Sequence, residues 1–143
     1  MKRETMLARF EKWTLSKCLE ATAKDLQLLV RMEAADGDGF AHCCSCGRRE
    51  HYKKMNGGHF ISRQHKATML DRQNVHAQCV RCNCMDNLPG YSAWLEATYG
   101  EGFTLELMDR GRHLKQWTRE ELVDLRMEFK RLIKIEKQRL GVD

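Results

Sequence analysis

Residues 43–83 read CCSCGRREHYKKMNGGHFISRQHKATMLDRQNVHAQCVRCN. This segment contains two Cys-x-x-Cys pairs, Cys43 with Cys46 and Cys79 with Cys82, and 32 residues lie between the pairs. Two such pairs are typical of a structural zinc site, in which four thiolates surround the ion at about 2.3 Å. We therefore predict a four-cysteine zinc clamp with no open coordination position for catalysis.

The remaining cysteines do not fit the same pattern. Cys44 and Cys84 adjoin the two pairs, but only the pairs themselves repeat the two-residue spacing. Cys18 lies within an apolar helical pattern, and we expect it to be buried as a small hydrophobic residue. No βαβ pattern surrounds either pair, so a redox motif is disfavoured. The clamp would replace the hydrophobic core that the polar, glycine-rich insert cannot supply.

Length and composition predict one soluble, helix-rich folding unit. The chain has 143 residues, of which 42% are hydrophobic and 31% charged, with a single proline. No apolar run approaches the roughly 20 residues that a membrane-spanning helix needs. The first residues, MKRETMLARFEKW, lack the apolar core of an export signal. We expect a cytoplasmic protein without membrane contact, whose thiols stay reduced.

Positive charge is concentrated between the cysteine pairs. The whole chain has a formal net charge of +5, yet the segment from Gly47 to Asn83 contains eight basic residues and two acidic ones. Such a concentration attracts a polyanion, although a solvated basic loop would show the same composition.

The apolar spacing predicts helices on both sides of this segment. One long amphipathic helix is expected from Glu4 to Ala34, ended by the Asp-Gly repeat at 36–39. A hairpin is expected over 40–62, with a strand at 57–61, and it is followed by an ordered loop over 63–74. A further helix should begin between Val80 and Asn83.

The C-terminal part predicts three more helices. The first two are expected at 91–99, closed by Gly100, and at 104–108. The last helix starts from Thr118 and Glu121, which have capping-box spacing, and ends at Gly141. Its apolar stripe could pack on the N-terminal helix or on a partner chain. The predicted fold class is α+β, mostly α, with an N-terminal helix (1–35), a zinc-clamped core (36–90) and a C-terminal helical region (91–143).

Two short motifs resemble those of a known family. The motifs NGGHFISR (56–63) and RQNVHAQCVRCN (72–83) are similar to those of the NinG/Rap family of lambdoid phage recombination nucleases. The resemblance covers about residues 35–140. It implies a zinc-containing HNH (ββα-metal) core within the predicted fold.

The resemblance also implies catalytic roles. His59 would be the general base, Asn74 would hold the loop and orient His59, and Asn83 would bind a catalytic Mg²⁺ or Mn²⁺. Phosphodiester hydrolysis needs an activated water and a cation that stabilises charge on the phosphate and the leaving oxygen. A neutral imidazole near pH 7 suits the base.

The chain differs at Gly58 from other HNH enzymes that the resemblance brings in. Many HNH enzymes of the endonuclease VII kind have a metal-binding Asp directly before the catalytic His. Asp71 is the natural substitute, with His65 and His76 as imidazole alternatives. Mg²⁺ prefers oxygen ligands, which favours Asp71.

The predicted partner is DNA, bound through its phosphates. Arginine offers paired donors to phosphate oxygens, and such contacts give affinity without sequence readout. The best candidates for phosphate contacts flank the predicted site and are Arg63, Lys66, Arg72 and Arg81. Further phosphate contacts are expected from Arg48, Arg49, Lys53 and Lys54.

Three classes of function remain open at this point. The first is a nuclease acting on branched DNA, such as a Holliday junction, fork or flap, in phage recombination. Other recombination proteins and a second copy of the chain could be its partners. The second is a non-catalytic zinc-stabilised DNA-binding module, and the third is a purely structural helical protein.

Overall fold

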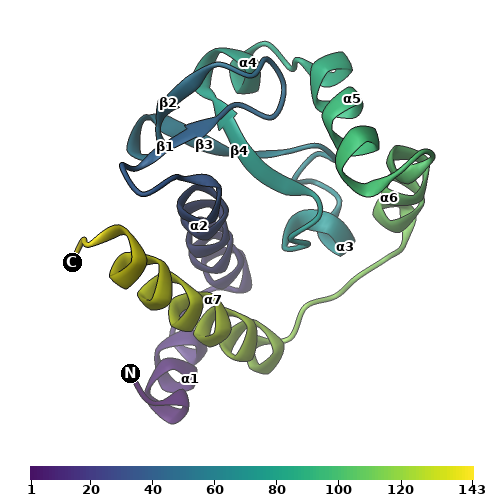
Figure 1. Cartoon of the computed structure of the whole chain (residues 1–143). Helices are drawn as coiled ribbons and strands as arrows, with labels where there is room; N and C mark the ends of the chain where they lie inside the picture. Colours follow the sequence, from purple (N-terminus) through teal and green to yellow (C-terminus); the bar gives the residue numbers. More distant parts are fainter.

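A computed structural model describes residues 1–143. The fold is α+β and mostly helical, with two small antiparallel sheets, β1–β2 and β3–β4 (Figure 1). In chain order the elements are α1 (Arg3–Glu11), α2 (Leu15–Ala34), β1 (Phe40–His42), β2 (Arg49–His51), the 3-10 turn η1 (Tyr52–Lys54), β3 (Met55–His59), α3 (Lys66–Met69), β4 (Val75–Cys79), α4 (Val80–Cys84), α5 (Leu88–Tyr99), α6 (Phe103–Arg112) and α7 (Arg119–Leu140).

The prediction of one unbroken N-terminal helix is wrong, because the chain turns between α1 and α2. The hydroxyl oxygen of Thr14 accepts a hydrogen bond from the Lys17 amide at 3.1 Å and so starts a new helix. Arg119 donates hydrogen bonds to the carbonyls of Phe10 and Trp13, at 3.0 and 2.8 Å. The carbonyls at the break therefore have a partner, and α1 packs against α7.

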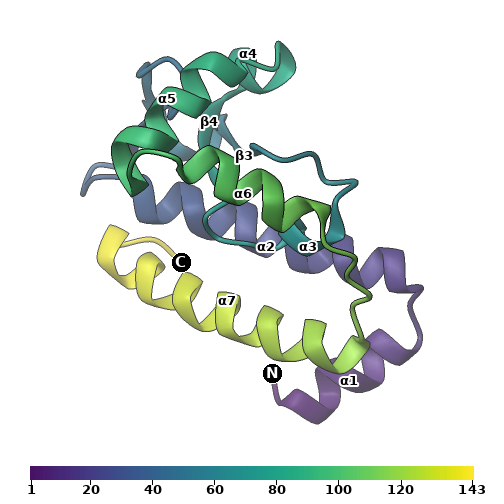
Figure 2. The same ribbon diagram turned by 90° about the vertical axis from the view of Figure 1, so that its right-hand side faces the viewer.

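Helix α2 is the central layer of the molecule. It lies between α7 on one side and the β3–β4 sheet on the other (Figures 1 and 2). One core cluster joins the three layers through Leu26 and Leu29 of α2, Val75 of β4 and Phe129 of α7. The apolar stripe of α7 thus packs on the N-terminal helices, the first of the two predicted alternatives.

A close approach fixes the position of the β3–β4 sheet on α2. The two strands pair with Gly58 opposite His76 and His59 opposite Val75. A Cβ atom at Gly57 would lie 2.6 Å from the Cα atom of Gln27. Only glycine allows this contact between strand and helix backbones.

The C-terminal helices begin and end largely where the sequence predicts. The hydroxyl of Thr118 accepts a hydrogen bond from the Glu121 amide, and the Glu121 carboxylate accepts one from the Thr118 amide. Gly141 ends α7 with a left-handed φ of 68°. Helices α5 and α6 are longer than predicted, and the loop over 63–74 contains the single turn α3. None of the helices combines the length and the apolar character needed to cross a membrane.

Replacing Gly57 by alanine tests the contact between β3 and α2. We expect Gly57→Ala to lower the free energy of unfolding by about 1–3 kcal/mol, because an added methyl group must displace helix backbone. Gly37→Ala is the matched control, since no atom lies within 4 Å of its Cβ position. Urea denaturation measures both, and equal stabilities of the two variants would contradict the prediction.

Candidate functional site

The four paired cysteines form one cluster. The Sγ atoms of Cys43, Cys46, Cys79 and Cys82 all lie within 4.8 Å of one another, and the Cys46 and Cys79 sulfurs are 3.8 Å apart. Thiolates at about 2.3 Å from a tetrahedral zinc ion would be about 3.8 Å from each other. The cluster could therefore hold a metal such as zinc.

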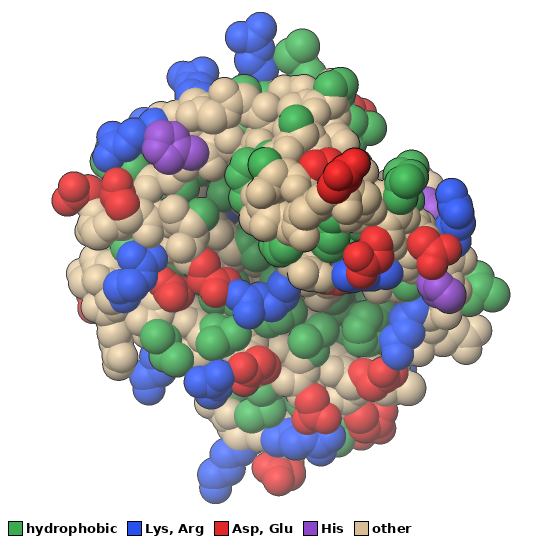
Figure 3. All heavy atoms as spheres, turned by 45° about the vertical axis from the view of Figure 1, so that its right-hand side comes forward, with side chains coloured by type: hydrophobic (Ala, Val, Ile, Leu, Met, Phe, Trp, Pro, Cys, Tyr) green, Lys and Arg blue, Asp and Glu red, His purple; other side chains and the backbone are tan.

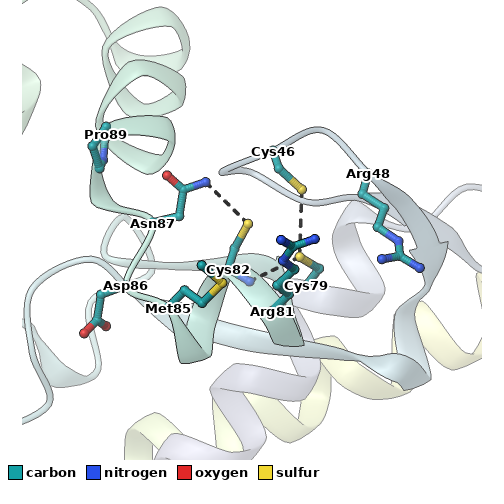
Figure 4. Close-up of a pocket in the computed structure, with 9 residues that line it drawn as sticks. All are labelled: Cys46, Arg48, Cys79, Arg81, Cys82, Met85, Asp86, Asn87 and Pro89. Carbon is teal, nitrogen blue, oxygen red and sulfur yellow. Dashed lines mark hydrogen bonds between the residues drawn. The ribbon is translucent and has the colours of Figure 1, made fainter.

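Backbone amides point at the sulfurs of this cluster. The Ser45 amide donates to the Cys43 sulfur and the Cys82 amide to the Cys79 sulfur, both at 3.4 Å. The Asn87 side-chain amide donates to the Cys82 sulfur, also at 3.4 Å (Figure 4). Such donors favour the charged thiolate, which is the form that binds metal.

The other three cysteines lie outside the cluster. Cys44 is buried in a separate core with Tyr91, and burial raises the pKa of its thiol to about 12. Cys18 is buried beside the Phe10 carbonyl, and Cys84 is exposed. The cluster thus contains only the two predicted pairs.

His59 is the last residue of β3, and only one of its two ring nitrogens is hydrogen-bonded. Its Nε2 lies 2.8 Å from the Met69 carbonyl oxygen. Because a carbonyl only accepts hydrogen bonds, Nε2 carries the proton and Nδ1 has the free lone pair. Burial lowers the pKa of His59 to about 4. The imidazole is therefore neutral at pH 7.

Asn74 holds the chain that leaves His59. This residue is fully buried. Its side-chain oxygen accepts a hydrogen bond from the Ile61 amide at 2.7 Å, and its Nδ2 donates to the carbonyls of Ile61 and Thr68 at 3.1 and 3.0 Å. The Thr68 contact fixes α3, whose Met69 carbonyl orients the His59 ring.

His59 and Asn83 line the same open cavity, of about 560 Å³. His65 and Asp86 also line it, and Asp86 is the single acidic residue in its wall. The Nδ1 of His65 lies 3.0 Å from the Gly111 carbonyl, so its Nε2 has a free lone pair. The cavity thus brings together a neutral base, an amide oxygen, an imidazole nitrogen and a carboxylate.

Asp71 does not line this cavity. One of its carboxylate oxygens accepts a hydrogen bond from Arg110 at 3.1 Å, and the other accepts from the Gln73 amide at 2.9 Å. Asp71 is predicted from the sequence because it is the only acidic residue between Glu50 and Asp86, and that prediction does not include Asp86 itself. The available signal was the position of Asp86 directly after the second cysteine pair and Asn83.

His76 points away from His59. Its place in β4 opposite Gly58 puts its side chain on the other face of the sheet from His59. The ring nitrogens lie 2.9 Å from the hydroxyls of Tyr91 and Tyr99. Burial lowers the pKa of His76 to about 4, so it is a neutral hydrogen-bonding residue.

The Gln78 side chain occupies the space next to Gly58. A Cβ atom there would lie 1.9 Å from the side-chain oxygen of Gln78. The Gln78 amide in turn donates to the Ser45 hydroxyl at 2.8 Å, which links β4 to the first cysteine pair. An aspartate at position 58 would require the Gln78 side chain to move out of this space.

Half of the predicted phosphate-binding residues form ion pairs with acidic side chains of this chain. The pairs are Arg48 with Glu50 (3.1 Å), Arg49 with Asp36 (3.2 Å), Arg63 with Glu20 (2.7 Å) and Arg72 with Glu33. Lys66 donates to the Arg63 carbonyl at 3.1 Å. Arg81, Lys53 and Lys54 form no ion pair. Basic and acidic side chains are also interspersed on the face in Figure 3.

Comparison with protein families gives a match over nearly the whole chain. The model described as bacteriophage lambda NinG protein matches residues 2–139. The match includes the cysteine cluster and the His59 cavity, and it begins well before the start expected from the motifs, so it also includes α1 and α2. No curated protein and no solved structure matches the chain.

Removing one cluster cysteine tests the metal site. We expect Cys79→Ser to lose its bound zinc and to unfold at a lower temperature, because folding and metal binding are coupled in such sites. Cys84→Ser is the control, since Cys84 is exposed and outside the cluster. Metal analysis and thermal unfolding measure the result. Unchanged zinc content in Cys79→Ser would exclude the four-cysteine site.

Proposed function

We propose a function from the premise that the chain belongs to the bacteriophage lambda NinG family, whose model spans residues 2–139. The chain is a metal-dependent HNH-type endonuclease that hydrolyses phosphodiester bonds in branched or structured DNA, such as Holliday junctions, forks or flaps, during phage recombination. The observation that carries the proposal is the neutral His59 imidazole with its free Nδ1, in one cavity with Asn83.

His59 acts as the general base. Its Nδ1 takes a proton from the attacking water, while Nε2 keeps its own proton and donates it in a hydrogen bond to the Met69 carbonyl. That carbonyl holds the ring in one tautomer and stabilises the cation that forms. Asn74 acts through the backbone, since it fixes both ends of the loop that contains α3.

The order of elements supports the ββα-metal assignment. His59 ends β3, Asn74 directly precedes β4, and Asn83 lies on α4, which follows β4 without a break. These are the three positions that give the HNH class its name, with Asn83 in the third. This order of strand, strand and short helix supports the proposed roles of the three residues.

The catalytic cation would be held by Asn83, Asp86 and His65 in place of Asp71. All three line the His59 cavity, and oxygen ligands suit Mg²⁺ and Mn²⁺. When bound, the cation would stabilise charge on the phosphate and on the leaving 3′ oxygen. The zinc would be structural, because the four thiolates leave it no open position.

The partners follow from the same site. DNA phosphates would meet Arg81, Lys53 and Lys54 first, because these cations have no internal ion pair. We also propose action in the host cytoplasm with other recombination proteins, and a dimer on a symmetric junction. Since α7 buries its apolar stripe within the chain, a dimer would use another surface.

The second candidate is a zinc-stabilised DNA-binding module without catalysis. The cysteine cluster and the unpaired cations fit this function as well. A panel of labelled junctions, forks, flaps, single strands and duplexes with Mg²⁺ or Mn²⁺ separates the two. Binding to DNA without any cutting would favour the module.

Substitution of His59 tests the catalytic role. We expect His59→Ala to reduce junction cleavage by about 10²–10⁴-fold, the usual contribution of a general base, with zinc content unchanged. His113→Ala is the control, because that side chain is 72% exposed and outside the cavity. Cleavage by His59→Ala at the wild-type rate would refute the assignment.

The pH dependence of cleavage tests the state of the base. Because burial lowers the pKa of His59 to about 4, its neutral form persists as the pH falls below 6.5. We expect the single-turnover rate to lack a descending acid limb near pH 6.5, the ordinary value for histidine. Rates measured between about pH 5 and 8 show this, and a limb centred near that ordinary value would contradict it.

A further inference from the structure

Two cavities meet at the segment between α4 and α5. The first contains His59, and the second, of about 490 Å³, lies against the cysteine cluster and contains Arg48 and Arg81. Asp86 lines both cavities. Each of residues 85–89 lines at least one of the two cavities, so this segment forms a wall between them. Figure 4 shows the side of this wall that faces the cysteine cluster.

This wall exposes apolar side chains. Met85 is 67% exposed and lines the arginine cavity, while Leu88 is 45% exposed and lines the His59 cavity. Pro89 is exposed beside them. Single exposed apolar residues are ordinary, but three within five residues at the rim of a polar site indicate a binding surface.

The wall is held rigidly by Asn87. The Asn87 amide donates to the Cys82 carbonyl at 3.0 Å and its side-chain amide donates to the Cys82 sulfur, while its side-chain oxygen accepts from the Gly90 amide at 3.2 Å. A Cβ atom at Gly90 would lie 2.0 Å from the Ser45 carbonyl oxygen, so α5 begins directly on the first cysteine pair. The backbone that carries the apolar side chains thus needs little ordering when a partner binds.

We propose that Met85, Leu88 and Pro89 form an apolar wedge that inserts between bases where a DNA duplex is interrupted by a branch. The inference rests on the proposed function, because it assigns the substrate of the same site. Met, Leu and Pro are among the residues that proteins insert between base steps. Unstacking is least costly where pairing is already interrupted, so the wedge selects branched DNA over plain duplex.

The basic side chains beside the wedge fit a DNA strand as the partner. The strand that reaches the His59 cavity from the arginine cavity must pass the wedge. Arg81 has no ion pair, and Arg48 has one only with Glu50, at 3.1 Å. These guanidinium groups hold a backbone phosphate on one side of the wedge while the scissile phosphate lies on the other.

The test uses a four-way junction with 2-aminopurine beside the branch, without Mg²⁺ or Mn²⁺ so that nothing is cut. We expect the wild-type protein to raise the fluorescence of this unstacked base. The Met85→Ala/Leu88→Ala variant should lose the rise, and its preference for junction over duplex should fall about tenfold, as for loss of one base-stacking contact. Zinc content verifies its fold.

Two further variants sharpen the test. The Met85→Leu/Leu88→Met variant keeps the apolar surface and should behave as the wild type. Leu105→Ala/Leu114→Ala is the matched control, because these leucines are 71% and 100% exposed but line neither cavity, and it should also behave as the wild type.

Three outcomes would overturn the wedge. The first is a fluorescence rise in Met85→Ala/Leu88→Ala equal to that of the wild type, and the second is an equal loss of the rise in Leu105→Ala/Leu114→Ala. The third is a dimer that dissociates in the alanine variant while the fluorescence rise remains. The last result would assign the surface to a second copy of the chain. A protein that unstacks the branch but never cuts it with Mg²⁺ or Mn²⁺ would support the wedge and contradict the nuclease.

Discussion

The convergence of four sulfur atoms is the constraint on which the centre of this molecule depends. One cysteine pair lies in the turn between β1 and β2, and the other lies where β4 becomes α4. The segment between the pairs contains mostly polar residues and glycine, and the core cluster around the sulfurs contains only six residues. A bound ion would therefore supply the cohesion that apolar burial does not. Asn83 lies on α4, which contains one of the four cysteines, and His59 lies on β3, which pairs with β4. The geometry of the cluster therefore bears on the candidate site through β4 and α4.

Helix α2 adds a second constraint by supporting the strand that ends in His59. It contacts β3 through backbone at Gly57, and it supplies Glu20 and Glu33 to the ion pairs of Arg63 and Arg72. These arginines are predicted phosphate contacts, so DNA would compete with α2 for them. Surface ion pairs of this kind contribute about 0–1 kcal/mol, and phosphates can replace the carboxylates at low cost. The helix thus lowers the net positive charge of this surface.

The sequence predicts the features of the fold that are determined by residues close together along the chain. The spacing of the cysteine pairs, the capping box at Thr118 and the glycine after α7 all predict features that the structure contains. Longer-range features were missed. Helical periodicity continues through residues 12–14, but it cannot show that Arg119 lies close enough to bind the carbonyls freed at a break. Likewise, Asp71 lies between the motifs in sequence, yet Arg110 holds its carboxylate, and the carboxylate in the cavity comes from Asp86.

The contact between Gly58 and Gln78 has a consequence for how this site can change. The Gln78 side chain fills the space above Gly58 and bonds to Ser45, so a larger residue at position 58 must displace a side chain that has another partner. An aspartate before the histidine requires Gln78 to turn away or to be replaced by a smaller residue, and either change leaves the Ser45 hydroxyl without this hydrogen bond. Residues 58, 78 and 45 are therefore coupled. Among relatives, an acidic residue at the first position should occur with a smaller residue at the second.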